Sequence, residues 1–179
     1  LFDIEPEMIK NISQYGWDCH WIKFNHKKRK IGMLRAFFKA YSLLRKIKPD
    51  VIQTNLFDDS LPVLFAAKLI GIKKRVLVKQ DTTFHYYYAP KWVLADKFNN
   101  YNATDIVPVS REAEKFIIEK ENANLEKITM IHHGIPSKIY TKQSGIHRKE
   151  LINKYNLEGK IVIGTVARLI DWKGYRYII

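Results

Sequence analysis

The chain has 179 residues, of which 46% are hydrophobic and 27% charged, and it carries a formal net charge of +13. This composition is close to that of globular proteins and excludes an intrinsically disordered chain. The single cysteine, Cys19, excludes an internal disulfide and a cysteine-rich zinc module, and it is typical of a reducing compartment. No apolar run reaches the roughly 20 residues of a membrane-spanning helix. We therefore expect a cytoplasmic protein.

Short apolar runs rich in β-branched or aromatic residues alternate with longer segments of helical periodicity. In chain order, helices are predicted over Glu5–Gln14, Ile31–Lys48, Ser60–Ile70, Lys91–Tyr101 and His147–Tyr155. Between the last two, a further helix is predicted to extend through Glu121 with Ser110 as its cap, and a final helix is predicted to begin near Lys173. Strands are predicted over Trp17–Phe24, Val51–Thr54, Arg75–Lys79, Ile106–Val109, Ile128–His132 and Ile161–Val166.

This strict alternation favours βαβ units, and so a Rossmann-like α/β fold with a parallel sheet and flanking helices. The composition becomes polar, without a strand pattern, between Ile135 and Gly159. We therefore predict a first Rossmann-like domain at 1–135, a linker and helix at 136–159, and the beginning of a second domain at 160–179. Ligands of such sheets bind beyond the carboxyl ends of the strands.

The segment from Gly164 to Gly174 carries the clearest chemical pattern. A predicted buried strand ends at Val166, Arg168 follows it, and Lys173 and Gly174 precede a predicted helix. A guanidinium, an ammonium and free helix N-terminal amides at one point suit a diphosphate. The alternative is an ordinary surface loop with two exposed cations.

This segment resembles the loop that opens the C-terminal domain of the retaining glycosyltransferases with the GT-B fold, glycosyltransferase family four. The family pattern there is Gly-Arg-Leu, a few residues, then Lys-Gly, with Ala167 standing here in place of the more usual Gly. The resemblance implies that Arg168, Lys173 and Gly174 bind the diphosphate of a nucleotide-sugar donor.

Three further segments resemble the family in the same order: Asp50–Asn55, Asp105–Ser110 and Ile131–Pro136. The last of these contains Gly134, which the resemblance places among the substrate-binding residues. The chain departs from the family pattern at Gln53, Asn55, His133 and Pro136, where the family more often has His, His, Asn and Asp.

A histidine follows the predicted strand that ends at Lys79. The family has a loop histidine here that touches the donor sugar, so the resemblance assigns a catalytic role to His85. Asp81 and Thr82 are neighbouring substrate-binding candidates. The alternative is a structural or merely exposed histidine.

The resemblance implies transfer of a sugar from a nucleotide-sugar donor, with retention, to a glycan or lipid-linked glycan in polysaccharide biosynthesis. The donor is a co-substrate, and neither a metal nor another cofactor is expected. The acidic pair Asp58–Asp59 lies at a predicted helix start, where it suits capping better than metal binding. The family's first strand and its Glu-x7-Glu motif lie outside these 179 residues, so the resemblance also implies a fragment that is inactive alone.

A basic region without any acidic residue extends between Asp18 and Asp50. Such a region attracts nucleic acid, anionic membranes or polyphosphate substrates. In the helix Ile31–Lys48, we expect Leu34, Phe37, Phe38, Tyr41 and Leu44 on one face and Arg35, Lys39 and Lys46 on another. The helix is then either an ordinary core-packed helix with a solvated basic face, or, together with the run Lys27–Lys30, a contact with anionic lipid at the inner face of a membrane.

Two other functions compete with the transferase. A nucleic-acid-binding module is compatible with the charge and the aromatic residues, but the sequence contains no recognisable motif for it, so no nucleic-acid partner is expected. A nucleotide-sugar epimerase of similar architecture is the second alternative. The linker and the loop carrying Arg168 and Lys173 favour the transferase over the epimerase.

Overall fold

The computed structural model describes residues 6–80, 84–135, 145–170 and 173–178. The chain divides into two compact units, Leu1–His133 and Gly134–Ile179. The helices of the first unit are α1 (Met8–Ser13), η1 (His26–Lys28), α2 (Arg29–Ile47), α3 (Phe57–Ile70), α4 (Phe84–Tyr88), η2 (Pro90–Trp92), α5 (Val93–Asn102), α6 (Arg111–Glu119) and η3 (Leu125–Lys127). Its strands are β1 (Val51–Thr54), β2 (Lys74–Lys79) and β3 (Asp105–Pro108). The second unit contains α8 (Gly145–Tyr155) and η5 (Tyr175–Tyr177).

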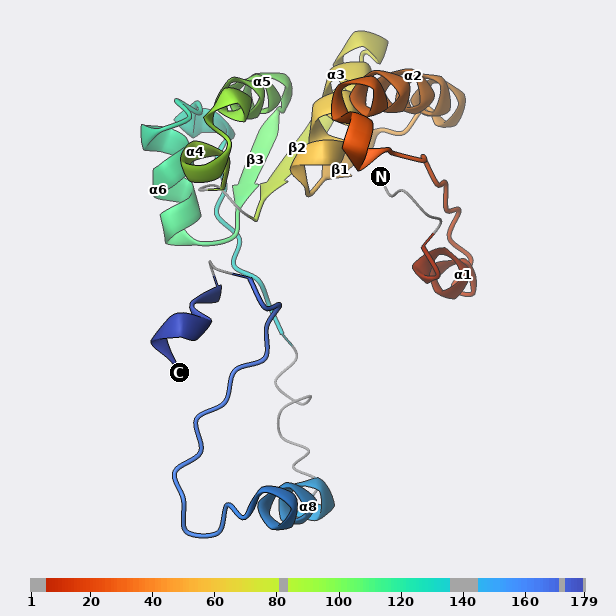
Figure 1. The fold of residues 1–179 in the computed structure, drawn as a ribbon. Coiled ribbons are helices and arrows are strands. Elements are labelled where there is room, and N and C mark those ends of the chain that lie inside the picture. The colour runs from red at the N-terminus through yellow and green to blue at the C-terminus, as the bar shows by residue number, and fades with distance from the viewer. Residues whose placement is uncertain (1–5, 81–83, 136–144, 171–172, 179) are drawn as a thin grey trace. The chain divides into compact units, whose positions relative to one another are not determined.

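The strands form a parallel three-stranded sheet in the order β1-β2-β3, with helices packed against it (Figure 1). The register pairs Thr54 with Leu77 and Lys79 with Pro108, so all three strands end at one edge. Parallel neighbours with helical crossovers are the arrangement that the alternating pattern predicts. The predicted Rossmann-like α/β class is confirmed.

The core lies between the sheet and its helices. Leu77 of β2 and Ile106 of β3 are buried against Leu64 of α3 and Ile117 of α6. Helix α3 packs on β1 and β2, and it also contacts α2 and α5. The first unit therefore has a continuous apolar centre, which holds the carboxyl edge of the sheet in place.

The predicted helix boundaries agree with the structure to within a few residues. Ser110 caps α6 as expected, because its Oγ accepts a hydrogen bond from the Ala113 backbone N–H at 3.1 Å. Helix α3 begins at Phe57, three residues before the predicted start, so Pro62 lies inside the helix rather than in its first turn.

Three predicted strands are not formed as strands. In Trp17–Phe24 only Lys23 is a bridge residue, although Phe24 is fully buried. Ile128–His132 runs beside β3 through a single bridge, Ile106 to Ile128. Two backbone hydrogen bonds accompany it, from the Thr129 N–H to the Ile106 carbonyl and from the Ile131 N–H to the Pro108 carbonyl. A strand exists only through a ladder of such pairs, and an apolar pattern alone does not supply the partner.

The third of these, Ile161–Val166, lies in the second unit and has no regular secondary structure. Ile161 is 96% exposed and Val166 fully exposed. The described part of this unit has no strand with which the segment could pair. The prediction that Arg168 stands at the end of a buried strand is therefore wrong for this structure.

Helix α2 faces the core differently from the prediction. Leu34 and Phe38 are 58% and 61% exposed, whereas the small residues Ala36 and Ala40 are buried. Small side chains let α2 approach α3 closely, and this turns the larger apolar residues outward. Phe37 and Tyr41 are half-buried and Leu44 is buried, so only part of the predicted apolar face is a core face.

None of the helices that the structure describes has both the length and the apolar character that a bilayer crossing needs.

Candidate functional site

A pocket lies at the carboxyl ends of β1 and β2, where ligands of parallel sheets bind. Its volume is about 180 Å³. Five segments line it: the β1–α3 connection, the first turn of α3, the end of β2, α4 and α5. The residues are Asn55, Leu56, Phe57, Ser60, Leu77, Val78, Lys79, Gln80, Phe84, His85, Asp96 and Asn99.

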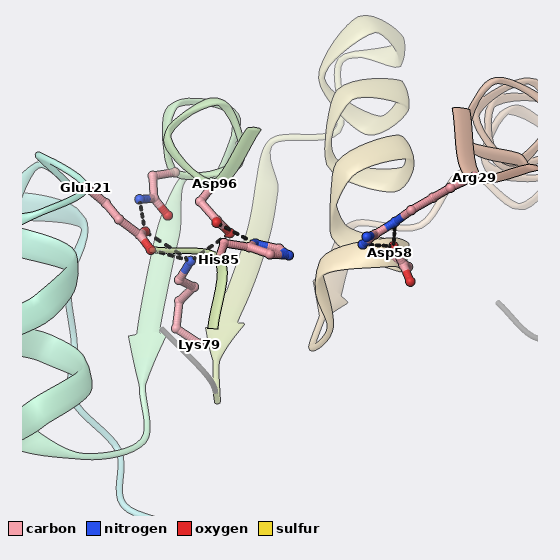
Figure 2. Close-up of polar contacts among 7 residues, drawn as sticks. Arg29, Asp58, Lys79, His85, Asp96 and Glu121 are labelled. Atoms are coloured by element: carbon pink, nitrogen blue, oxygen red, sulfur yellow. Dashed lines mark hydrogen bonds and ion pairs between the residues drawn. The ribbon is translucent and has the colours of Figure 1, made fainter. Parts of the chain in front are cut away.

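A buried polar network, formed by Lys79, His85, Asp96, Asn100 and Glu121, supports one wall of this pocket (Figure 2). The Lys79 ammonium lies 3.3 Å from Asp96 Oδ1 and 3.0 Å from Glu121 Oε2. Asn100 Nδ2 donates to Glu121 Oε2 at 2.7 Å. Every member is less than a tenth exposed. Buried charges of this kind are stable only when they are paired, so the network holds its members in defined positions.

The orientation of His85 is set by Asp96. His85 Nδ1 lies 2.7 Å from Asp96 Oδ2, and an ionised carboxylate can only accept, so Nδ1 carries the proton. The edge of the His85 ring packs against Phe57, with 4.2 Å between centroids. In the neutral imidazole, Nε2 is then left with a lone pair. His85 lines the pocket, so this nitrogen is the polar group that it offers to a ligand.

Two further polar side chains of the pocket lack hydrogen-bond partners. Ser60 Oγ and Asn99 Oδ1 are buried and unpartnered, and their residues are 1% and 2% exposed. A buried polar atom without a partner costs free energy, so native structures satisfy nearly all of them. Both atoms are closed off from solvent in this structure, so residues that line the pocket carry unused hydrogen-bonding capacity.

Asp58 and Asp59 hold the β1–α3 connection, and the capping role expected of them is confirmed for Asp59. Asp59 Oδ1 accepts from the Leu56 backbone N–H at 2.8 Å, and burial raises the Asp59 pKa above 3.8. Asp58 instead pairs with Arg29 of α2, whose Nη2 lies 2.6 Å from Oδ1. The Arg29 guanidinium also lies over the Trp92 ring (Figure 2 shows the Arg29–Asp58 pair).

The diphosphate candidates Arg168 and Lys173 are exposed. The Tyr175 hydroxyl holds the segment locally, since it donates to the Ala167 carbonyl at 2.6 Å. Gly174 has a left-handed backbone, with φ of 71°, and precedes a single turn, η5. Among the described residues this turn has only three members, so no helix N-terminal amide site is seen after Gly174, and diphosphate binding by Arg168 and Lys173 stays a prediction.

The remaining candidates lie elsewhere. Asp81 and Thr82 fall outside the described residues. Gly134 is exposed, and a side chain added there would meet no heavy atom within 4 Å. Of the predicted sugar-side residues that the structure describes, His85 lines the pocket and Gly134 does not.

Sequence analysis missed Asp96, Glu121, Asn99 and Ser60. A signal existed in α5, where Asp96, Asn99 and Asn100 are spaced three and four residues apart and so share one helix face. That face is buried, while Leu94 and Tyr101 are 76% and 68% exposed. Polar residues on one helix face usually indicate a solvent-exposed face, so this pattern alone does not predict burial.

Within the described ranges, no group of three or more His, Cys, Asp or Glu side chains is arranged to hold a metal ion. The independence from metal stays a prediction.

Three comparisons bear on the identity of the chain. The model of Glycosyltransferase Family 4 matches residues 10–138. The chain is 24% identical over 177 residues to the capsular polysaccharide biosynthesis glycosyltransferase CapM of Staphylococcus aureus, covering 95% of this chain and 46% of that protein. It superposes on the crystal structure of a glycosyltransferase from Rickettsia africae ESF-5 with a TM-score of 0.62 and 15% identity, covering 98% of this chain and 46% of the other.

The chain thus spans about half the length of the relatives that it matches. The structural likeness agrees with the Rossmann-like sheet and its flanking helices. The family model covers most of the chain, including β1, β2, β3 and every residue of the pocket. On this evidence the chain belongs to glycosyltransferase family 4.

Proposed function

We propose that this chain is the acceptor-side part of a glycosyltransferase that moves a sugar from a nucleotide-sugar donor to a glycan or lipid-linked glycan. The observation that carries the proposal is the pocket at the carboxyl ends of β1 and β2, with His85 in its wall. A role in polysaccharide biosynthesis is supported by the likeness to the capsular polysaccharide glycosyltransferase.

The chemistry of the pocket suits a sugar ring. His85 Nε2 is a hydrogen-bonding atom of the kind that sugar hydroxyls satisfy, whereas Ser60 Oγ and Asn99 Oδ1 are buried and unpartnered atoms of residues that line the pocket. The aromatic side chains of Phe57 and Phe84 supply an apolar wall. A neutral, hydroxyl-rich ring fits both features.

The same pocket disfavours a phosphate. Among the described residues that line the pocket, Lys79 is the only lysine or arginine. Its ammonium already pairs with Asp96 and Glu121. Two carboxylates around one ammonium leave no cation for an added anion. The donor diphosphate therefore belongs with other cations, and Arg168 and Lys173, which are exposed and near each other in the sequence, are the proposed partners.

In the proposed reaction, the bond between the anomeric carbon and the diphosphate oxygen breaks, and the acceptor oxygen bonds to that carbon on the same face. The acceptor proton leaves with the diphosphate, and the configuration is retained. Arg168 and Lys173 stabilise the negative charge that develops on the diphosphate. His85, oriented by Asp96, hydrogen-bonds a hydroxyl of the sugar as positive charge spreads over its ring. No metal takes part in this proposal.

The test is the release of nucleoside diphosphate by the full-length protein from a panel of nucleotide sugars, each with and without EDTA. We expect release from one donor, stimulated by an oligosaccharide or lipid-linked acceptor and unaffected by EDTA. The anomeric configuration of the product, read by NMR, tests retention. Absence of release from every donor, by a protein that circular dichroism shows to be folded, would contradict the proposal.

A further inference from the structure

An apolar ridge runs along the outer face of α2, on the side turned away from α3. It consists of Ile31, Leu34 and Phe38, which are 51%, 58% and 61% exposed. Their spacing of three and four residues places them on one face over about two turns. Three large apolar side chains in a row on a surface helix need an explanation, whereas a single one does not.

Basic side chains flank this ridge. Arg35 and Lys39 each follow a ridge residue by one position, about 100° further round the helix, and both are exposed. Lys30 precedes Ile31, and Lys27 and Lys28 lie in η1 at the beginning of α2; all three are exposed. Neither η1 nor α2 contains an acidic residue. Arg29 does not contribute, because its guanidinium pairs with Asp58.

We propose that this ridge and its basic flanks form a docking surface for an anionic lipid membrane, with α2 lying parallel to the bilayer. Ile31, Leu34 and Phe38 enter the boundary between headgroups and acyl chains, and Lys30, Arg35 and Lys39 meet the lipid phosphates. An apolar stripe between basic side chains is the pattern that binds interfaces through both burial and charge.

Other occupants fit the surface less well. A second copy of the chain would bring the same cations against these cations, and three ridge residues are far fewer than the roughly 20–30 residues a side of a stable interface. Nucleic acid would place its phosphates between the basic side chains, where they would meet the apolar ridge instead of cations.

The test is sedimentation of the full-length protein with vesicles of phosphatidylcholine alone and with vesicles that also contain phosphatidylglycerol. We expect binding only to the vesicles with phosphatidylglycerol, weakening as salt is raised. The double variants Leu34→Ser/Phe38→Ser and Arg35→Ala/Lys39→Ala should each lose about 10-fold or more in vesicle affinity, since each basic contact alone is worth roughly 5-fold.

Matched control variants distinguish binding through this surface from nonspecific hydrophobic or electrostatic binding elsewhere on the protein. Leu125→Ser removes an equally exposed apolar residue of η3, and Lys73→Ala removes an exposed cation between α3 and β2; both should bind like the wild type. Equal binding to both kinds of vesicle, binding to neither, or unchanged binding by the two double variants would overturn the proposal. So would a dimer, detected by light scattering, that the ridge variant abolishes while vesicle binding persists.

Discussion

The polar residues around His85 form a buried network, whereas those around Arg168 lie in an exposed segment. Lys79, His85, Asp96 and Glu121 are spread over more than forty positions of the sequence, yet they meet in the core of the first unit. Arg168 and Lys173 are five residues apart, and both remain exposed. Tertiary packing, and not proximity in the sequence, therefore brings the polar residues around His85 together.

The largest expected effect follows from removing the cation at the centre of the network. Lys79→Met leaves Asp96 and Glu121 buried without their ammonium, so the free energy of unfolding should fall by about 3–5 kcal/mol. Urea unfolding measures it. Lys173→Met, which changes an exposed side chain of the second unit, is the matched control and should leave the midpoint where it is.

A double variant sharpens this prediction. Lys79→Met/Glu121→Gln removes one of the two orphaned carboxylates, so it should recover part of the lost stability. If Lys79→Met alone unfolds at the wild-type urea concentration, the network does not exist as described.

Loss of the carboxylate that orients His85 should affect the reaction more than the fold. In Asp96→Asn, the His85 Nδ1–H loses its ionised acceptor, while Lys79 keeps its contact with Glu121. We expect kcat to fall about 100-fold, with the KM for the donor changed much less. Steady-state kinetics of the full-length protein measure both constants; a change in KM alone would show that Asp96 does not act through His85.

A smaller effect on stability is expected at the start of α6, where the sequence alone predicted the helix cap correctly. Ser110→Ala removes the hydrogen bond to the Ala113 backbone N–H and should cost about 1 kcal/mol of stability. Ser110→Thr retains a hydroxyl and should recover most of it. Thermal or urea unfolding of the wild type, Ser110→Ala and Ser110→Thr measures these differences in stability.

The smallest effect is a pH dependence in the β1–α3 connection. Burial raises the Asp59 pKa above 3.8, so its charged form is disfavoured in the folded state. As pH rises from 3.8 through the raised pKa, the wild type should lose stability relative to Asp59→Asn, and the difference should then level off. Urea midpoints of both proteins between about pH 4 and pH 7 measure this difference. A constant difference would show that burial does not perturb Asp59.

The same comparison explains what the sequence could and could not predict. Periodicity, glycines and the cap at Ser110 are local signals, and they predicted the parallel sheet and most helices correctly. The strand Ile161–Val166 needed a partner that a local pattern does not contain. The faces of α2 were assigned from hydrophobicity alone, but Ala36 and Ala40 are what pack inward; in α5, polar side chains are buried, which hydrophobicity does not predict.

The candidate site was predictable only in part. His85 could be named because it follows a strand and resembles a family position, but its partner Asp96 is one of many charged residues on predicted helices. The unpartnered atoms of Ser60 and Asn99 become visible only when burial is known. Side chains that act through tertiary contacts leave little trace in a single sequence.

The proposed reaction requires that His85 of the pocket and the exposed cations Arg168 and Lys173 are each needed for turnover of the same nucleotide sugar. The most direct test measures nucleoside diphosphate release by the full-length protein and by its His85→Gln and Arg168→Gln variants, together with their urea midpoints. We predict a loss of about 100-fold or more in both variants, with the midpoint of Arg168→Gln unchanged. Wild-type release by a folded Arg168→Gln or His85→Gln variant would contradict the claim.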